Sequence, residues 1–144
     1  MTARILIVDD EPKMAASIQK ALTRSGYRCA VATDGERAEE IFDDQGADVV
    51  VTDRRMPGTG GLELMERLLA KEPDLPVILI TAYGDVRSAV DAMGRGAFHF
   101  LVKPFDLDEL RGLIARALEV RHLQEENRQL RQELADHKAG SLIA

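Results

Sequence analysis

The feature that most constrains the fold is a repeated alternation between short apolar runs and longer amphipathic stretches. The runs are rich in β-branched residues, which is typical of strands buried on both faces of a parallel sheet. We expect strands at 4–8, 27–32, 48–52, 77–80 and 98–102. Strands that alternate with helices at this spacing predict βαβ units with right-handed crossovers. The sequence therefore predicts an α/β fold, a flavodoxin-like doubly wound five-stranded parallel sheet of order 2-1-3-4-5.

The stretches between these runs carry apolar residues at helical spacing, with one buried face each. Pro12 suits the first turn of the first helix, and Gly26 suits the left-handed position after its end. Val86, Val90 and Met93 recur at i, i+4 and i+7 and predict a fourth helix. The second and third helices are expected at 36–44 and about 62–70.

The last helix continues beyond what a small domain needs. It starts near Asp106, and apart from Gly112 nothing breaks it before about His137, a span of about 48 Å at 1.5 Å per residue. Its second half fits heptads, with a and d positions at Val120, Leu123, Asn127, Leu130 and Leu134. This pattern predicts a dimerising coiled coil, in which the polar Asn127 favours register over stability. A solvated helix, or one folded back on the domain, remains the alternative.

These patterns divide the chain into three parts. We expect a globular domain at 1–117, a helical coiled-coil linker at 118–138 and a disordered tail at 139–144.

Composition excludes several classes of protein. The 144 residues carry 19 basic and 25 acidic side chains, for a net charge of −6, and only 4% are aromatic. This balance argues against a segment that binds nucleic acid, which needs clustered Lys and Arg. No run approaches the ~20 apolar residues of a membrane span, and the first residues lack the apolar core of a signal peptide. The single cysteine, Cys29, indicates a reducing, cytoplasmic compartment and a buried strand thiol.

Four of the expected strands end in residues with carboxylate, hydroxyl or ammonium side chains, which can bind ligands or take part in catalysis. Asp9 and Asp10 follow the first strand, Asp53 the third, Thr81 the fourth and Lys103 the fifth. In an open parallel sheet, ligands bind beyond the carboxyl ends of the strands, where the strand order reverses. Three carboxylates that converge there repel one another unless cations offset them. Lys103 supplies one positive charge, and Mg²⁺, which accepts carboxylates plus waters, is the expected cofactor.

The same groups indicate a class of reaction. A metal ion and a lysine neutralise a transferring phosphoryl group, whose reaction is mostly positioning and electrostatics. A carboxylate is ionised at neutral pH and can be the nucleophile without a general base. Taken singly, Asp10 could merely cap a helix and Asp53 could merely form a turn. Five suitable groups at four strand ends favour the chemical role.

Four motifs carry a resemblance to a known family. They are VDDEP after the first strand, TDRRMPG around Asp53, ITA ending at Thr81, and FLVKPF around Lys103. The chain from Thr2 to about Ala117 resembles the receiver domain of two-component response regulators, the CheY-like fold. The resemblance implies that Asp53 is the phosphoacceptor and takes its phosphoryl group from a sensor histidine kinase in a phosphorelay.

The resemblance also implies a ligand set for the metal. Asp10 and Asp53 would bind Mg²⁺ directly, together with the backbone carbonyl of Arg55. Asp9 would act through a metal-bound water. Arg54 and Arg55 would flank the crevice, where we expect them to influence kinase docking.

Four further residues receive roles from the same resemblance. Lys103 would contact the phosphoryl oxygens, and its peptide bond to Pro104 would be cis, a state that costs little only before proline. Thr81 would move to hydrogen-bond the phosphoryl group, and Phe100 would turn inward beside the fourth strand. These two residues would form a switch, a two-state equilibrium biased by phosphorylation.

A finer likeness concerns the segment from TAYGDV to LDEL and the long helix after it. This stretch is similar to regulators of the NtrC type, enhancer-binding activators that depend on an alternative sigma factor. The likeness implies a downstream AAA+ ATPase and a DNA-binding domain, for which these 144 residues hold neither a P-loop nor a helix-turn-helix. It further implies a receiver homodimer, formed through the fourth helix, fifth strand and linker, that controls this output in transcription activation.

Other functions remain as alternatives. A Mg²⁺-dependent aspartyl phosphatase would want an acid two residues after its nucleophile, whereas that position is Arg55. A flavin or nucleotide binder would want a Gly- or hydroxyl-rich loop where this chain has DDEP. A stand-alone single-domain response regulator that acts by protein–protein contacts, and a dimerisation module with a vestigial acidic site, complete the set. The resemblance implies a signalling domain rather than an enzyme, although one that catalyses its own phosphorylation and dephosphorylation.

Overall fold

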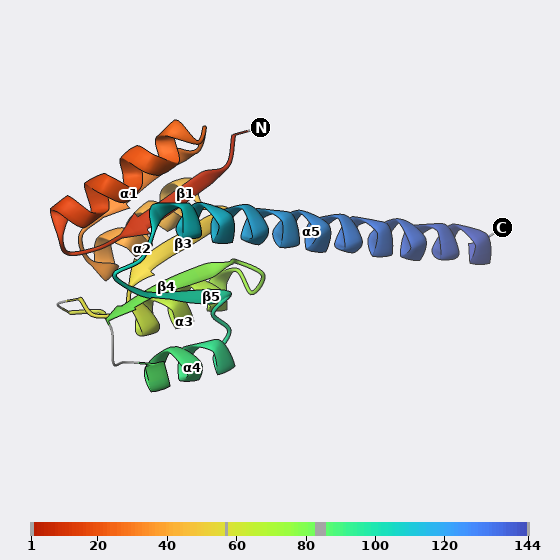
Figure 1. Cartoon of the computed structure of the whole chain (residues 1–144). Coiled ribbons are helices and arrows are strands. Elements are labelled where there is room, and N and C mark those ends of the chain that lie inside the picture. The colour runs from red at the N-terminus through yellow and green to blue at the C-terminus, as the bar shows by residue number, and fades with distance from the viewer. Residues whose placement is uncertain (1, 57, 83–85, 144) are drawn as a thin grey trace.

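The chain folds around a parallel sheet whose strand order, β2-β1-β3-β4-β5, is the predicted one (Figure 1). The structure is a computed structural model, and it describes residues 2–56, 58–82 and 86–143. The strands are β1 (Arg4–Val8), β2 (Arg28–Ala32), β3 (Val49–Asp53), β4 (Val77–Ala82) and β5 (His99–Lys103). The helices are α1 (Pro12–Arg24), α2 (Gly35–Gln45), α3 (Gly61–Lys71), α4 (Val86–Gly94) and α5 (Leu107–Ile143). The alternating apolar pattern thus predicted every one of these elements.

Local sequence explains where the first two helices begin and end. Pro12 is the first residue of α1, and Gly26, just beyond its end, has a φ of 94°, a left-handed conformation that suits glycine. Asp34 caps α2, because its side chain accepts a hydrogen bond from the backbone N–H of Arg37 at 2.8 Å. The sequence placed the start of α2 one residue too late, since Gly35 is already helical.

Alternate residues of each strand face opposite layers of helices. Leu6 and Val8 of β1 pack in a core cluster with residues of α2, α3 and α4. Ile5 and Ile7 pack instead with residues of α1 and α5. A sheet covered on both faces needs apolar side chains at every position of its inner strands, which is why the sequence shows continuous runs there.

The fourth predicted helix exists as α4, but the large apolar residues that predicted it are not the ones that face the core. Ala89 and Ala92 of α4 are buried, whereas Val90 and Met93 are 60% and 38% exposed. Alanine has no side chain beyond Cβ, so it lets a helix lie close to a sheet, and the larger residues are left outside. The side chain of Val86 lies outside the described part of the chain.

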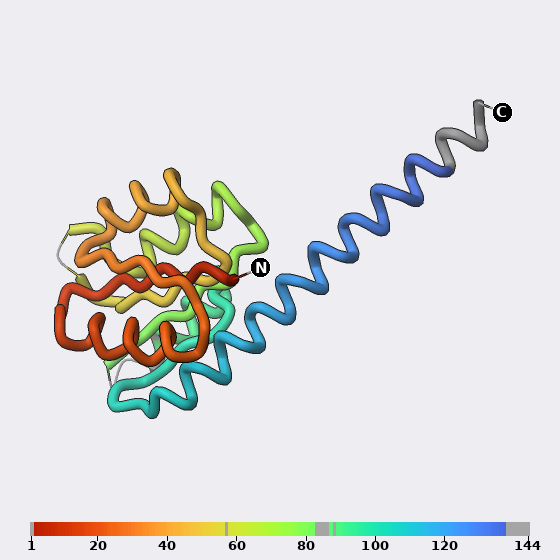
Figure 2. The backbone as a smooth tube through the Cα atoms, turned by 90° about the horizontal axis from the view of Figure 1, so that it is seen from above, coloured from red at the N-terminus to blue at the C-terminus, as the bar shows by residue number. Residues whose placement is uncertain are grey.

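The long helix α5 has a packed half and a projecting half. Leu110, Leu113, Ile114 and Ala117 pack in the core beside α1, and beyond them the helix extends far from the domain (Figure 2). α5 includes residues 139–143, position 144 lies outside the described residues, and the disordered tail expected at 139–144 stays a prediction. No proline interrupts this segment, and one glycine costs a helix only about 1 kcal/mol. Among the helices described, α5 included, none is long and apolar enough to cross a membrane.

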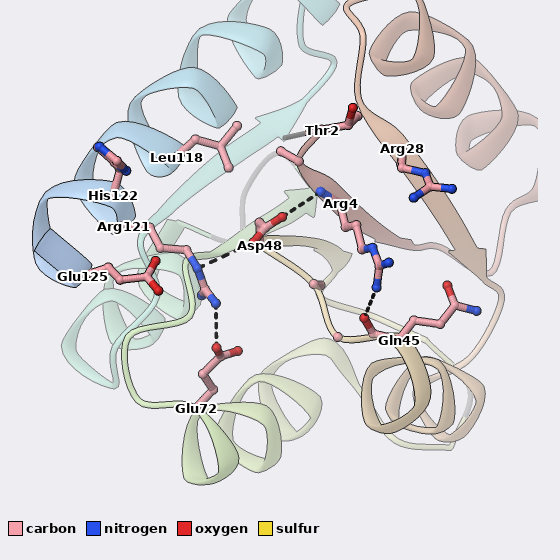
Figure 3. Close-up of a pocket in the computed structure, with 13 residues that line it drawn as sticks. Thr2, Arg4, Arg28, Gln45, Asp48, Glu72, Leu118, Arg121, His122 and Glu125 are labelled. Atoms are coloured by element: carbon pink, nitrogen blue, oxygen red, sulfur yellow. Dashed lines mark hydrogen bonds and ion pairs between the residues drawn. The ribbon is translucent and has the colours of Figure 1, made fainter. Parts of the chain in front are cut away.

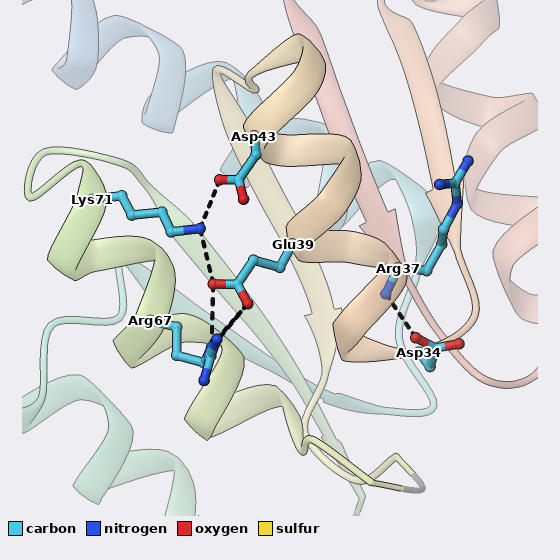
Figure 4. Close-up of polar contacts among 6 residues, drawn as sticks. All are labelled: Asp34, Arg37, Glu39, Asp43, Arg67 and Lys71. Carbon is cyan, nitrogen blue, oxygen red and sulfur yellow. Dashed lines mark hydrogen bonds and ion pairs between the residues drawn. The ribbon is translucent and has the colours of Figure 1, made fainter.

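Ion pairs join α2 to α3 on the outer surface of the molecule (Figure 4). Glu39 of α2 lies 2.7 Å from the Arg67 guanidinium and 2.9 Å from the Lys71 ammonium, both on α3. Lys71 also contacts Asp43 at 2.6 Å. Hydrogen bonds from Arg67 and Lys71 hold the pKa of Glu39 below its ordinary value.

This lowered pKa predicts how the effect of Glu39→Gln on stability depends on pH. An acid whose pKa is depressed by folding stabilises the native state above its unfolded pKa, and the contribution disappears as pH falls through the folded pKa. We therefore expect Glu39→Gln to lower the urea midpoint slightly at pH 7, and the difference from wild type should decrease as the pH falls below the ordinary glutamate pKa. The matched control is Glu40→Gln, which removes only an exposed ion pair with Arg37. If the two substitutions had equal effects that did not change with pH, the stabilising role given to the ion pairs of Glu39 would be contradicted.

Candidate functional site

The carboxyl edge of the sheet gathers the residues that the sequence singled out. β1 pairs with β3 in a register that places Val8 opposite Thr52, so Asp9 and Asp53 follow as neighbours at the strand ends. Asp9, Asp53 and Thr81 are buried, with 1%, 8% and 1% of their surface exposed. Asp10 is exposed at the rim of the same edge.

Three carboxylates meet at this edge. Asp9, Asp10 and Asp53 each offer one oxygen, and these three atoms lie within 4.8 Å of one another. One oxygen of Asp9, Oδ1, accepts a hydrogen bond from the backbone N–H of Glu11 at 2.9 Å. The other, Oδ2, is buried and has no hydrogen-bond partner in the described part of the chain. An unpartnered buried oxygen beside two more carboxylates is an arrangement that a bound cation would stabilise.

Burial raises the pKa of the Asp9 carboxyl, and the nearby charges of Asp53 and Asp10 raise it further. The hydrogen bond from Glu11 and the charge of Lys103 act in the opposite direction without cancelling the rise. A group with a raised acid pKa favours either a proton or a positive neighbour over the bare charged state. The donor set is oxygen alone, which fits a hard divalent ion such as Mg²⁺.

Lys103 reaches the cluster from the end of β5. Its ammonium donates a hydrogen bond to Oδ2 of Asp53 at 3.1 Å, and Oδ1 of the same carboxylate accepts one from the backbone N–H of Arg55 at 3.3 Å. Burial opposes the charged lysine, but contact with the Asp53 carboxylate outweighs it and raises the pKa of Lys103. Lys103 therefore stays charged at neutral pH, and its peptide bond to Pro104 is cis, as the resemblance implied.

Thr81 and Phe100 lie on adjacent strands near this cluster. The hydroxyl of Thr81 is buried and lacks a hydrogen-bond partner among the residues described. Phe100 is half-buried and packs against the core cluster that contains α3 and α4. Their coupled movement stays a prediction.

The linker residues with expected roles lie far from this site. The apolar ones are all exposed, with exposed fractions of 38% for Val120, 56% for Leu123, 53% for Leu130 and 62% for Leu134. Asn127 is also exposed. Nothing within the described chain covers this side of α5.

One residue that supports the site was missed in the sequence. A Cβ added to Gly61, the first residue of α3, would lie only 2.1 Å from the carbonyl oxygen of Asp53 and 2.9 Å from Cα of Arg54. The N–H of Gly61 also donates to the carbonyl of Arg54 at 2.9 Å. The start of α3 thus packs directly against the peptide that carries Asp53. The Gly60-Gly61 pair was the available signal, since adjacent glycines mark either a turn or a close backbone approach.

The chain matches a family of known domains. Residues 5–115 match the family model described as the response regulator receiver domain. The chain is 44% identical over 133 residues to the C4-dicarboxylate transport transcriptional regulatory protein DctD of Pseudomonas aeruginosa, covering 92% of this chain and 29% of that protein. It is 39% identical over 120 residues to the DNA-binding transcriptional regulator NtrC of Klebsiella pneumoniae, covering 83% and 25% respectively.

A solved structure of a related protein is also similar to this chain. NtrX from Brucella abortus, crystallised in complex with ADP, superimposes with a TM-score of 0.86 at 34% identity, covering 90% of this chain and 30% of that one. The chain therefore spans between a quarter and a third of the length of these three proteins.

The close packing at Gly61 yields a prediction with an adjacent control. Gly61→Ala should lower the free energy of unfolding by about 1–3 kcal/mol, because a methyl group must displace either α3 or the Asp53 peptide. Gly60→Ala should lower it by less than Gly61→Ala does, since its Cβ would meet only the Arg54 carbonyl oxygen at 3.4 Å and the remaining cost is that of alanine at the N-cap of α3. Urea unfolding of both variants is the measurement, and equal losses would refute the special role of Gly61.

Proposed function

Because the chain belongs to the response regulator receiver domain family, we propose that it accepts a phosphoryl group on Asp53 from the phosphohistidine of a sensor histidine kinase. The observation that carries this proposal is the geometry of Asp53. Its carboxylate is largely buried, lies 3.1 Å from an ammonium group and belongs to a cluster of three acids. A capping or turn aspartate needs none of these neighbours.

The residues present can perform the transfer. A carboxylate oxygen of Asp53 attacks phosphorus directly and needs no general base. A phosphorus–oxygen bond forms on Asp53 while the phosphorus–nitrogen bond of the phosphohistidine breaks, and the imidazole keeps the electron pair and binds a proton. Lys103 stabilises the charge of the phosphoryl oxygens, which is where an ammonium at this position acts most strongly.

A magnesium ion fits the acidic cluster as the cofactor of this reaction. Asp10 and Asp53 would hold it directly together with the backbone carbonyl of Arg55, and Asp9 would hold it through water. When bound, Mg²⁺ supplies positive charge to the phosphoryl oxygens. The orphaned Oδ2 of Asp9 and the raised pKa of its carboxyl support a cation there.

The phosphoryl group then acts as a switch. The unpartnered hydroxyl of Thr81 is available to donate a hydrogen bond to a phosphoryl oxygen, and Phe100 on the next strand turns inward as Thr81 moves. The phosphoryl group needs only to interact better with one arrangement than with the other to shift the equilibrium.

The output of the switch is dimerisation. The exposed apolar side of α5 pairs with a second copy of the chain as a coiled coil, in keeping with the predicted heptads. In a longer regulator of the NtrC type, the arrangement of this dimer controls a following AAA+ ATPase and DNA-binding domain in the cytoplasm. A stand-alone receiver that acts through protein–protein contacts is the runner-up.

Phosphorylation is tested with acetyl phosphate and Mg²⁺. We expect one hydroxylamine-labile phosphoryl group per chain, absent after Asp53→Asn and prevented by EDTA. Lys103→Gln should slow phosphorylation by about 10²-fold or more, because it removes a preorganised cation at the reacting oxygens. The matched control is Lys20→Gln, an exposed lysine on α1. An adduct that survives Asp53→Asn would overturn the proposal, and steady phosphate release without an accumulating adduct would indicate an aspartyl phosphatase.

Dimerisation is tested separately, by sedimentation equilibrium. Leu130→Lys places a charge at a d position of the predicted coil and should weaken the dimer at least about tenfold, or about 1.4 kcal/mol. Gln129→Lys, one residue earlier and off the apolar side, should leave the dimer unchanged. Circular dichroism checks that both variants keep the helix. Equal association of the two variants would contradict a coil formed along this side.

A further inference from the structure

The projecting half of α5 is attached to the domain by charged side chains after its apolar contacts end. Ala117 is the last fully buried residue of the helix. Four residues later, Arg121 donates a hydrogen bond to Oε1 of Glu72 at 2.5 Å and lies 3.9 Å from Asp48 (Figure 3). A further two turns along, Arg128 forms an ion pair with Asp74. We call these five residues the linker clamp: Arg121, Arg128, Asp48, Glu72 and Asp74.

The acidic partners of the clamp belong to the fixed scaffold of the domain. Glu72 is the C-cap residue of α3, and its N–H donates to the carbonyl of Leu68. Asp48 immediately precedes β3, and its carboxylate accepts a hydrogen bond from the N–H of Arg4 at 2.8 Å. Asp74 lies in the short connection between α3 and β4. The clamp therefore holds the helix to the sheet edge opposite the acidic site.

The two arginines lie on one side of the helix, away from its apolar side. They are seven residues apart, which is about 10.5 Å along a helix and nearly two full turns. At 100° per residue, Arg121 points about 130° away from the midpoint between Val120 and Leu123. Exposure agrees with this geometry for Arg121, whose side chain is 19% exposed whereas Leu123 is 56% exposed, while the Arg128 side chain is 70% exposed and pairs with Asp74 at the surface.

We propose that the linker clamp fixes the direction in which α5 leaves the domain, so that its apolar side is turned away from the domain and toward a second copy of the chain. The choice of a second copy rests on the proposed function, whereas the clamp itself acts within one unphosphorylated chain. Arg121 and Arg128 are positioning residues in this scheme. They act on the helix and touch neither the phosphoryl group nor the metal site.

Without the clamp, the helix would have no side-chain anchor beyond Leu118, which still packs against the core, among the contacts described. A helix end that packs on nothing frays and bends, because its stability comes mainly from tertiary contacts. The ion pairs extend the anchored length by ten residues, from Leu118 to Arg128, or about 15 Å. They are partly exposed, so each is weak and screened by salt, but two on the same side act together on one rigid helix.

The experiment measures the distance between the domain and the linker. Spin labels are placed on Lys20→Cys of α1 and Gln129→Cys of α5, with Cys29→Ala removing the native thiol. Leu130→Lys is included to prevent pairing, and unlabelled protein is added in excess so that only distances within one chain are recorded. Circular dichroism and urea unfolding confirm that each variant keeps its fold. We expect a single narrow distance distribution for this parent.

The variants distinguish a helix whose direction is held by the clamp from a helix whose own stiffness is enough to hold it. Arg121→Ala with Arg128→Ala should widen the distribution at least about twofold, because the anchored length then ends ten residues earlier, at Leu118. The matched control is Arg116→Ala, an exposed arginine of the same helix for which the described residues show no ion pair, and it should keep the distribution narrow. A narrow distribution in the double variant would overturn the proposal.

A charge swap tests the specific pairing. In the Arg121→Ala background, Arg128→Asp should give a broad distribution, and adding Asp74→Arg should narrow it again. A swap that fails to restore the narrow distribution would count against the assigned pair. These measurements use unphosphorylated protein, so they test the clamp independently of phosphorylation. The clamp proposal can be wrong while Asp53 is phosphorylated normally, and the clamp can be present in a chain that is not phosphorylated on Asp53.

Discussion

The pairing of β1 with β3 is the constraint from which the rest of the site follows. Both strands are covered on both faces, so their register is fixed by side chains that cannot exchange faces without exposing the core. That register carries Asp9 and Asp53 to the same edge, where burial and like charges oppose ionisation of Asp9. The apolar sheet thereby imposes an electrostatic arrangement that these carboxylates would not adopt in water.

This arrangement explains why the ammonium of Lys103 is needed even before any reaction. Its contact with Asp53 offsets part of the repulsion among three acids, and the remaining negative charge is left for a cation. Removing a carboxylate would relieve the repulsion but would also remove an oxygen donor from the proposed cation site. Gly61 belongs to the same compromise, because only a residue without Cβ lets α3 lie against the Asp53 peptide.

The sequence predicted the sheet order and the convergence of three carboxylates at one edge, because both depend on local patterns with strong physical meaning. Continuous apolar runs mark strands buried on both faces, and their polar ends must meet at one edge of a parallel sheet. The buried side of α4 was not accessible in this way, since Ala89 and Ala92 are too small to dominate a periodic pattern that Val90 and Met93 also fit. The ion pairs of Arg121 and Arg128 are equally invisible in sequence, because they join residues about fifty positions apart in a chain rich in charges.

One helix, α3, connects the acidic cluster with the linker clamp. The first residue of α3 packs against the peptide of Asp53, and its C-cap, Glu72, holds Arg121 of α5. A helix of eleven residues with three side chains fully buried in the core moves as a unit rather than deforming along its length. The start of α3 lies too close to the Asp53 peptide to admit a Cβ at Gly61, and its C-cap residue binds Arg121. A single rigid helix therefore supports the acidic cluster at one end and anchors α5 at the other.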